Sequence, residues 1–439
     1  MKRGDGCRSA CSVWPQFPTA LETFMRKIAL LLAATCVVAA SPAYATNGMR
    51  MIGFGPVQDS MGGVGVGTTL DACSLLSNPA GIADLGQRLD VGGAYFKPTV
   101  KYSATGAAPG QIVAQDGATL DSTRGGSPIP ALAYVRPIND RLSAGIGVFG
   151  VAGMGVDYPT NLYQGATYTS YLQGRFTPGA AYKLTDTLSV GATANVMVAQ
   201  MKYDVASGFG QALHDTATSA GIGATVGVKF TPVRMVTLGA AYETKSWFQD
   251  FSFKVAERPN PMAPGTTIPG GTDKLTFDQP QSVTLGASVT PFEMLLLAAD
   301  VQWINWSQTM GKGLPKYSSD ASATGAMPFD MNWSDQWVLK VGAQVAPMRG
   351  LKVRAGYNYG KMPLDPNRAF ENLAFPAVTE HHVTGGVGYE LGDRWAFNLT
   401  GIYALNTKLQ GANAAEQFIT AYTTEMSQFE VDFGLSYRF

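Results

Sequence analysis

The last nine residues of the chain alternate strictly between two kinds of side chain. The apolar positions are Val431, Phe433, Leu435, Tyr437 and Phe439, and the polar or small ones are Asp432, Gly434, Ser436 and Arg438. A period of two places these sets on opposite faces of a β-strand. The same alternation recurs along most of the chain, and an aromatic pair closes the terminus, where soluble proteins usually fray. We therefore predict an all-β barrel whose apolar face meets lipid and whose polar face lines a lumen.

Residues 1–45 have the features of a secretory signal peptide. Arg26 and Lys27 precede an apolar run over 28–40, and an Ala-Tyr-Ala cleavage pattern ends at Ala45. The run is too short to span a membrane as a helix. The polar stretch before Met25 is unlike the start of such a peptide, which favours Met25 as the initiator.

The composition narrows the compartment and the class of protein. The chain carries 32 Lys and Arg and 32 Asp and Glu, so no excess of positive charge favours nucleic-acid binding. Only Cys73 lies beyond the signal peptide, so no internal disulfide is expected. No later apolar stretch is long enough for a transmembrane helix. An exported chain of alternating strands indicates the outer membrane of a Gram-negative bacterium.

Short turns containing Pro, Gly, Asn or Asp separate pairs of alternating segments. They lie at residues 138–140, 184–186, 231–233, 290–292, 347–350 and 391–393. Six pairs of strands, with one more strand at 88–96 and one at 430–439, predict a 14-stranded antiparallel barrel. An even count is typical of bacterial barrels, whose short turns face the periplasm and whose long loops are extracellular.

The parity of charged residues supports this orientation. Leu351 and Val353 take the predicted lipid-facing parity, and Lys352 and Arg354 take the inward parity. A charge on the lipid face would cost about 2–4 kcal/mol at mid-bilayer. A large soluble sandwich or propeller would reverse the two faces, and alternation alone does not separate these folds. The signal peptide and the terminal Phe439 favour the barrel.

The Gly-rich stretch at residues 46–87 does not alternate like a strand. It must lie loose in the periplasm or fold inside the lumen. Glycine allows a backbone to pack closely against a wall or a ligand. We predict that residues 46–87 form a plug and that residues 88–439 form the barrel.

Several segments, taken in order, resemble the long-chain fatty acid and aromatic hydrocarbon transporter family of the outer membrane (FadL/TodX type). They are Thr46-Asn47-Gly48, Met61-Gly62-Gly63-Val64-Gly65, the plug motif Asn78-Pro79-Ala80-Gly81, and the barrel segments 299–307, 333–337, 351–357 and 380–389. The resemblance implies a 14-stranded barrel with an N-terminal plug, passive uptake of hydrophobic molecules, no cofactor and no enzymatic activity. It also implies release sideways into the membrane through a kinked strand, for which Gly145, Gly147 and Gly150 are candidates.

A fatty acid needs a cationic partner for its carboxylate, because a buried anion is costly unless it is paired. The inward-parity candidates are Arg175, Lys245 and Lys340. They could instead form lumen ion pairs with Glu243, Asp300 or Asp84. Members of the family often have Gly-Arg-Tyr in the second outer loop, but residues 165–168 here read Gly-Ala-Thr-Tyr. A neutral hydrocarbon therefore stays open as the ligand.

By the same resemblance, residues on the third and fourth outer loops would collect the ligand. The candidates are Phe209, Leu213, Phe251, Phe253 and Met262. Packing within the loops is the alternative role for them. An apolar patch exposed to the outside would favour collection.

Two other functions are compatible with a barrel. A non-selective porin needs an open lumen, which a plug would obstruct. An outer-membrane lipid hydrolase needs a nucleophile and a base, and the chain has three His, of which His381 and His382 begin a predicted strand. No His, Cys and carboxylate spacing predicts a metal site. The expected partners are a hydrophobic small molecule and the surrounding lipid and lipopolysaccharide.

Overall fold

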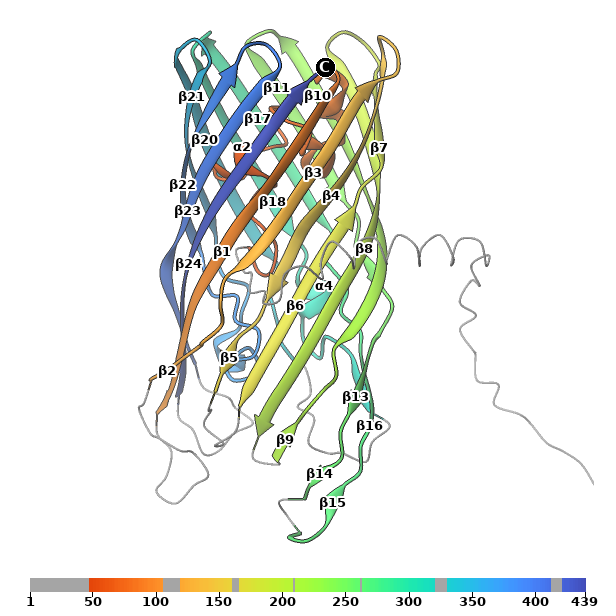
Figure 1. Ribbon diagram of the computed structural model, residues 1–439, viewed down its shortest axis with the longest axis vertical. Helices are drawn as coiled ribbons and strands as arrows, with labels where there is room; N and C mark the ends of the chain where they lie inside the picture. Colours follow the sequence, from red (N-terminus) through yellow and green to blue (C-terminus); the bar gives the residue numbers. More distant parts are fainter. Residues whose placement is uncertain are drawn as a thin grey trace, which may run out of the picture.

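The computed structural model describes residues 47–105, 119–159, 166–207, 210–260, 263–319, 330–411 and 421–439. Within them the chain forms a closed antiparallel barrel of 14 strands (Figure 1). The predicted fold is confirmed. The predicted signal peptide lies outside the described residues and stays a prediction.

The wall strands follow one another around the barrel in chain order. They are β1 (Arg88–Thr105), β3 (Ser127–Pro137), β4 (Leu142–Met154), β6 (Thr167–Phe176) continued by β7 (Gly179–Lys183), β8 (Leu188–Ser207), β10 (Ala217–Val233), β11 (Val236–Glu243), β17 (Ser282–Phe292), β18 (Leu295–Ile304), β20 (Gln336–Met348), β21 (Leu351–Gly360), β22 (His381–Leu391), β23 (Trp395–Gly411) and β24 (Ala421–Arg438). Pairing of β24 with β1 over the full length of β1 closes the barrel. The six predicted turns connect these strands at one end.

Shorter elements lie inside the barrel or in the loops at its far end. They are the helices α2 (Pro56–Asp59), α3 (Ser74–Ser77), η1 (Pro79–Asp84), α4 (Ser307–Met310) and η2 (Pro366–Arg368), and the strands β2 (Thr119–Asp121), β5 (Asp157–Tyr158), β9 (Gly210–Ala212), β12 (Trp247–Phe248), β13 (Phe251–Val255), β14 (Arg258–Pro259), β15 (Thr267–Ile268), β16 (Gly271–Leu275) and β19 (Tyr317–Ser319). No helix in the described part of the chain is long and apolar enough to cross a membrane.

The two faces of the wall have the predicted polarity. Val353 is 43% exposed and Phe433 is 60% exposed on the outside of the barrel. Arg354 is 6% exposed and Asp300 is 1% exposed, because both point into the lumen. Apolar side chains thus cover the outer surface, as a barrel in lipid requires.

Several strands differ from their predicted extents. The alternation predicts strands over 175–183 and 188–199, whereas β6 begins at Thr167 and β8 continues to Ser207. Both strands are longer than predicted because their backbone pairing continues past the alternating segments into the region of the long loops. The strand predicted to end at Lys183 is interrupted between β6 and β7 at Thr177 and Pro178. Proline has no N–H for the ladder, although Thr177 still exchanges backbone hydrogen bonds of 2.8 and 3.1 Å with Gly147.

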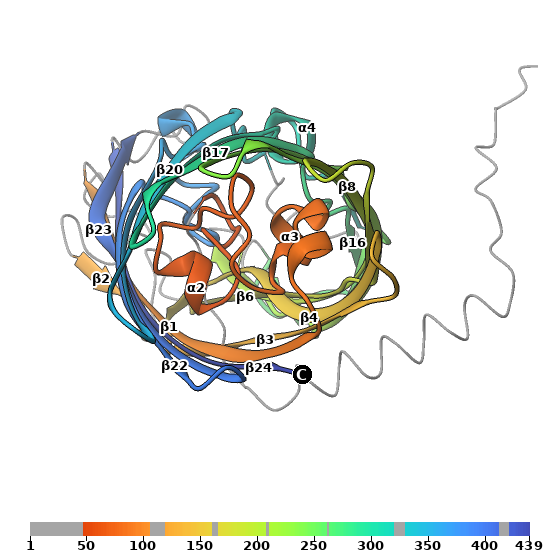
Figure 2. The same cartoon turned by 90° about the horizontal axis from the view of Figure 1, so that it is seen from above.

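The segment at residues 47–87 lies within the ring of strands (Figure 2). It occupies the end of the barrel that carries the short turns, and it includes α2, α3 and η1 (Figure 1). Most of its side chains are buried. We call residues 47–87 the plug from here on.

One wall carboxylate binds three consecutive amides of the plug. Asp300 on β18 accepts hydrogen bonds from the backbone N–H groups of Gly65 (2.8 Å), Val66 (2.9 Å) and Gly67 (3.1 Å). Ser288 on β17 then donates to the carbonyl of Gly67 at 2.7 Å. A run of N–H groups around one anion is a strong arrangement, because bonds to charged acceptors are roughly twice as strong as neutral ones.

Glycines on the wall let the plug backbone approach this closely. A β-carbon added at any of them would lie less than 3.0 Å from a plug atom. They are Gly191, Gly227, Gly239, Gly286, Gly342, Gly356, Gly386 and Gly434. We call these eight residues the glycine girdle. The wall is therefore shaped to the plug at the level of the backbone.

The plug motif makes a second attachment. Asn78 donates from Nδ2 to the carbonyls of Val66 and Val228, both at 3.0 Å, and Val228 belongs to β10. Its Oδ1 accepts from the N–H of Ala80 at 3.2 Å, which caps η1. Pro79 follows at the first helical position, where its missing N–H costs nothing. Asn78 thus joins two parts of the plug and the wall at once.

We predict that Asp300→Ala releases the plug. Three amides lose their acceptor, and each unsatisfied buried group costs about 1–3 kcal/mol. In planar bilayers the unmodified protein should show low conductance, and the variant should show larger, fluctuating currents. A large constant current from the unmodified protein would contradict a plug that fills the lumen.

Gly286→Ala should have a similar but smaller effect, because the added methyl would press on the plug backbone. Gly401→Ala on β23 is the matched control, since a β-carbon there meets no atom within 4 Å. Equal conductance changes in the two glycine variants would contradict the close contact between plug and wall.

Candidate ligand-binding site

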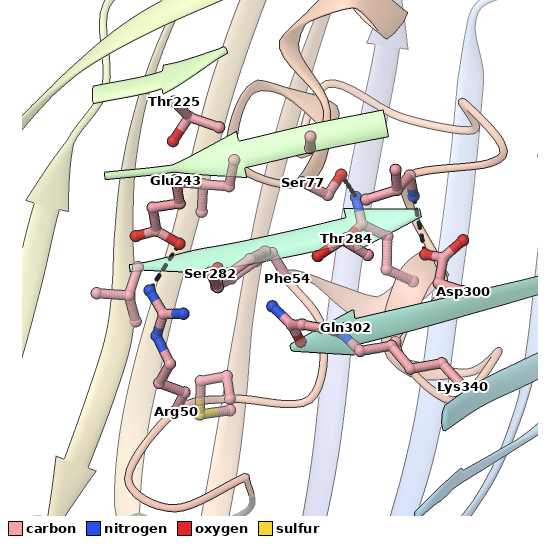
Figure 3. Close-up of a pocket in the computed structure, with 18 of the residues that line it drawn as sticks. Arg50, Phe54, Ser77, Thr225, Glu243, Ser282, Thr284, Asp300, Gln302 and Lys340 are labelled. Atoms are coloured by element: carbon pink, nitrogen blue, oxygen red, sulfur yellow. Dashed lines mark hydrogen bonds and ion pairs between the residues drawn. The ribbon is translucent and has the colours of Figure 1, made fainter. Parts of the chain in front are cut away.

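A small cavity of about 50 Å³ lies between the plug and the wall. Arg50 and Phe54 enter it from the plug, and Glu243, Asp300 and Lys340 enter it from the wall strands (Figure 3). The volume of the cavity suits a few water molecules, not a long-chain ligand.

Two guanidinium groups share one carboxylate at this cavity. Arg175 on β6 contacts Oε1 of Glu243 at 2.6 Å, and Arg50 contacts Oε2 at 2.6 Å. The sequence already offers the ion pair between Arg175 and Glu243 as an alternative role for Arg175, because Arg175 takes the inward-facing parity. Two cations against one anion leave one positive charge in excess, and all three side chains are nearly excluded from solvent.

The environment of Arg50 is unfavourable for its charge. Burial lowers the pKa of Arg50, Glu243 raises it, and the neighbouring Arg175 lowers it again. Arginine nevertheless stays protonated at neutral pH. Nε and Nη1 of Arg175 have no hydrogen-bond partner within the described residues. These donors are available to a further acceptor.

Arg175 lies directly below an apolar region on the same strand. Tyr171, Gln173 and Arg175 alternate along one face of β6, and all three point into the lumen. Tyr171 belongs to a large buried cluster, and its hydroxyl accepts from Gln279 at 3.0 Å. The cationic groups thus lie at the plug end of the apolar region. We call this end the floor of the apolar region.

That region, the apolar cluster, fills the loop end of the barrel with aromatic and methionine side chains. Its aromatic and methionine members are Met49, Tyr102, Met154, Tyr158, Tyr171, Met197, Met201, Tyr203, Phe248, Phe251, Phe253, Phe277, Trp306, Met310, Met331, Trp333, Phe375, Tyr422 and Met426. Many of them come from the long loops and not from the wall. The lumen therefore has a polar half around the plug and an apolar half beneath the loops.

The other two candidate partners for a ligand carboxylate, Lys340 and Lys245, lie in different surroundings. Lys340 donates to the carbonyl of Ile52 at 2.8 Å, so it holds the plug. Lys245 pairs with Asp278 at 2.8 Å and is partly exposed. Of the three candidates, only Arg175 shares its carboxylate partner with a second cationic side chain.

Sequence reasoning missed Arg50. A usable signal exists, because Arg50 is the single Lys or Arg between Thr46 and Gln87. A lone cation in a segment expected to fill a lumen needs a carboxylate partner. Which wall carboxylate it meets depends on packing between distant residues, and the sequence does not reveal that.

The candidate collecting residues do not form a common surface patch. Phe251 and Phe253 are fully buried within the apolar cluster, where their rings stack 6.1 Å apart. Leu213 is half exposed. Phe209 and Met262 lie outside the described residues. Packing beneath the loops accounts for the two phenylalanines.

The wall is incomplete between β3 and β4. Their pairing stops at Ala131 and Phe149, although β3 extends back to Ser127 and β4 continues to Met154. A bulge in β4 between Gly150 and Ala152 accompanies the separation. Gly150 is one of the three glycine candidates for the kinked strand, and it lies at this bulge.

The start of the plug covers the free edge of β4 from inside. Gly153 donates to the carbonyl of Met49 at 3.2 Å, and Met51 donates to Val151 at 3.4 Å. Met51 also packs with Phe96 and Ile129 in a small apolar cluster beside the gap. The segment that carries Arg50 therefore closes the same gap.

The histidines do not form a hydrolytic site in the described residues. Nε2 of His214 lies 3.0 Å from Asp273, and Ser319 donates to that carboxylate and not to the ring. Nδ1 of His214 has no partner there. His381 contacts Tyr357, and His382 is buried without a hydrogen bond to a serine.

Comparison with known proteins supports one family. The family model described as "Outer membrane protein transport protein (OMPP1/FadL/TodX)" matches residues 32–439. A search of curated proteins gave no match. Solved structures that resemble the chain include the toluene transporter TodX of Pseudomonas putida, with 19% identity, coverage of 90% of this chain and 100% of that one, and a TM-score of 0.71.

Two further structures are similar to the same extent. A FadL homologue of Pseudomonas aeruginosa has 17% identity, coverage of 89% and 100%, and a TM-score of 0.70. The toluene transporter TbuX of Ralstonia pickettii has 20% identity, coverage of 88% and 99%, and a TM-score of 0.65. These likenesses show a shared fold. Because the family model matches nearly the whole chain, the protein belongs to the OMPP1/FadL/TodX family, whose members are outer-membrane transporters of hydrophobic compounds and not enzymes.

Proposed function

We propose that this transporter takes up long-chain fatty acids or related amphipathic molecules and releases them sideways into the membrane. One observation carries the proposal: the excess positive charge of Arg50 and Arg175 over Glu243 lies directly beneath the apolar cluster. An acyl chain would enter the apolar cluster, and its carboxylate would contact the floor.

The chemistry of the floor suits a carboxylate. Guanidinium groups bind carboxylates through paired N–H donors, and Arg175 has two nitrogens without partners among the described residues. Binding there would balance the excess charge left by Glu243. The arrangement would take the role of the arginine that residues 165–168 lack.

Ligand entry needs side chains to move. A cavity of about 50 Å³ is far smaller than a fatty acid, and the apolar cluster occupies the space above it. Met197, Met201 and Met310 are unbranched, so they can change rotamer at low cost. The ligand would replace contacts among these side chains with contacts of its own.

Release would follow the gap between β3 and β4. The segment that closes this gap includes Met49, Arg50 and Met51. A carboxylate bound at Arg50 would pull on that segment and loosen its bonds to Val151 and Gly153. Transfer into lipid then follows the preference of the acyl chain for hydrocarbon, about 0.8 kcal/mol for each CH₂. No energy source is required.

A neutral aromatic hydrocarbon is the second candidate ligand. TodX and TbuX are described as toluene transporters. The aromatic content of the apolar cluster favours such a ligand, and the existing pairing of Arg175 with Glu243 means that no anion is required to satisfy it. Binding of a fatty acid would depend on the positive charge of Arg50 and Arg175, whereas binding of a neutral hydrocarbon would not.

We predict that Arg175→Gln weakens fatty acid binding and leaves toluene binding unchanged. A hydrogen bond to a charged group contributes about 1.5–3 kcal/mol, so the dissociation constant should rise roughly 10- to 100-fold. Titration of purified protein with oleate and with toluene measures both. Lys408→Gln is the control, because Lys408 also forms an ion pair, with Glu425, but on the exposed loop side.

Unchanged oleate affinity in Arg175→Gln, with tight binding of toluene, would contradict a fatty acid as the ligand. Mass spectrometry of lipids that co-purify with the protein supplies an independent check. Fatty acids in the unmodified protein and their loss in the variant are the expected result.

We predict that Gly150→Val slows release without weakening binding. A β-carbon at Gly150 would lie 2.8 Å from Ile129 across the gap, so a larger side chain would fill the exit. Uptake of labelled oleate by cells should fall several-fold, while its dissociation constant for the purified protein stays the same. Gly401→Val, in open space, is the control. Normal uptake by Gly150→Val would place the exit elsewhere.

A further inference from the structure

Three carboxyl groups meet between the plug and the wall, apart from the Arg175 site. They belong to Asp59 at the end of α2 and to Glu430 and Asp432 on the inner face of β24. An oxygen atom from each lies within 4.8 Å of one from both others. Asp59, Glu430 and Asp432 are 2%, 2% and 1% exposed.

These carboxyl groups lack the partners that buried anions need. Both side-chain oxygens of Asp432, Oδ1 of Asp59 and Oε1 of Glu430 have no hydrogen-bond partner outside the three carboxyl groups in the described part of the chain. No salt bridge in that part includes any of the three, and the amino group of Lys340 donates to the carbonyl of Ile52. Like charges this close, buried and unpaired, are strongly unfavourable.

A cavity of about 20 Å³ lies at the same place and is lined by all three residues. This volume holds one occupant of the size of a water molecule. Asp432 lines this cavity from a fully buried position, and neither of its oxygens has a partner outside the three carboxyl groups within the described residues. The cavity therefore combines the size of a single ion with an excess of anionic oxygen atoms.

We propose that Asp59, Glu430 and Asp432 bind one hard divalent cation, Ca²⁺ or Mg²⁺. Both ions prefer oxygen ligands, and carboxylates are the usual protein donors. The remaining positions would be taken by water or by backbone carbonyls around the cavity. Ca²⁺ accepts irregular coordination more readily than Mg²⁺, which favours it at a site made by two separate parts of the fold.

The position of the site gives the ion a role. Asp59 belongs to the plug and the other two ligands belong to the wall, so the ion joins the two. The same cavity is bordered by Ile129 and Gly150 of the gap between β3 and β4. A bound cation would hold the plug in place beside that gap, and its removal would leave three repelling carboxyl groups.

The test uses the full protein, purified in detergent and stripped of metal with a chelator. Calorimetric titration with CaCl₂ and with MgCl₂ at neutral pH should show saturable binding near one ion per chain. The thermal unfolding temperature should rise with the ion. Asp432→Asn and Glu430→Gln should each weaken binding at least tenfold and remove most of the thermal shift. Glu293→Gln, on an exposed turn, is the control and should match the unmodified protein.

Heat-dependent gel migration reports whether each variant is folded, and one folded variant of the two suffices. An unmodified protein without saturable binding would overturn the proposal. So would variants that bind like the control, or an unfolding temperature that changes with pH but not with the cation, as expected for carboxyl groups that share protons. Oleate binding measured with and without the cation separates this site from the proposed fatty acid function.

Discussion

The rest of the structure depends on the attachment of the plug to Asp300. A carboxylate on the wall accepts from the amides of Gly65, Val66 and Gly67, and it does so inside a lumen where water competes little. The glycine girdle makes the short distance available around the circumference. Together with the bonds of Asn78 and Lys340, this attachment places the plug across the polar half of the lumen, where only small cavities are left. We therefore expect a ligand to enter the apolar half under the loops.

The candidate site exists only because two parts of the chain meet. Arg50 comes with the plug, and Arg175 and Glu243 come with the wall. The residues beside Arg50 also cover the edge of β4 at the gap. In the proposed function, binding and exit would therefore share a short stretch of backbone. This coupling would require no large domain movement, because a displacement of a few residues changes both the floor of the apolar cluster and the inner cover of the gap.

The sequence predicts the wall well and the lumen poorly. Alternation along 351–357 and 431–439 assigns the faces, and turns such as 391–393 place the strand ends, because both signals are local. The contacts of Arg50 with Glu243 and of Asp59 with Asp432 join residues far apart in the sequence, so no local sequence pattern predicts them. Pro178 marks a break within a predicted strand, yet its neighbour Thr177 keeps the register. The sequence leaves the role of Phe251 and Phe253 open between ligand collection and loop packing, because loop residues carry no periodic signal for burial.

The inner cover of β4 has a mechanical consequence. Val151 accepts a backbone hydrogen bond from Met51 and Gly153 donates one to Met49, and Met51 and Val151 also border the small cavity beside Arg50. Displacing residues 49–51 therefore breaks two backbone hydrogen bonds, each at a net cost of about 0.5–1.5 kcal/mol. In the proposed release route, a passing ligand would hold this segment aside, and the two backbone bonds would form again once the ligand has left.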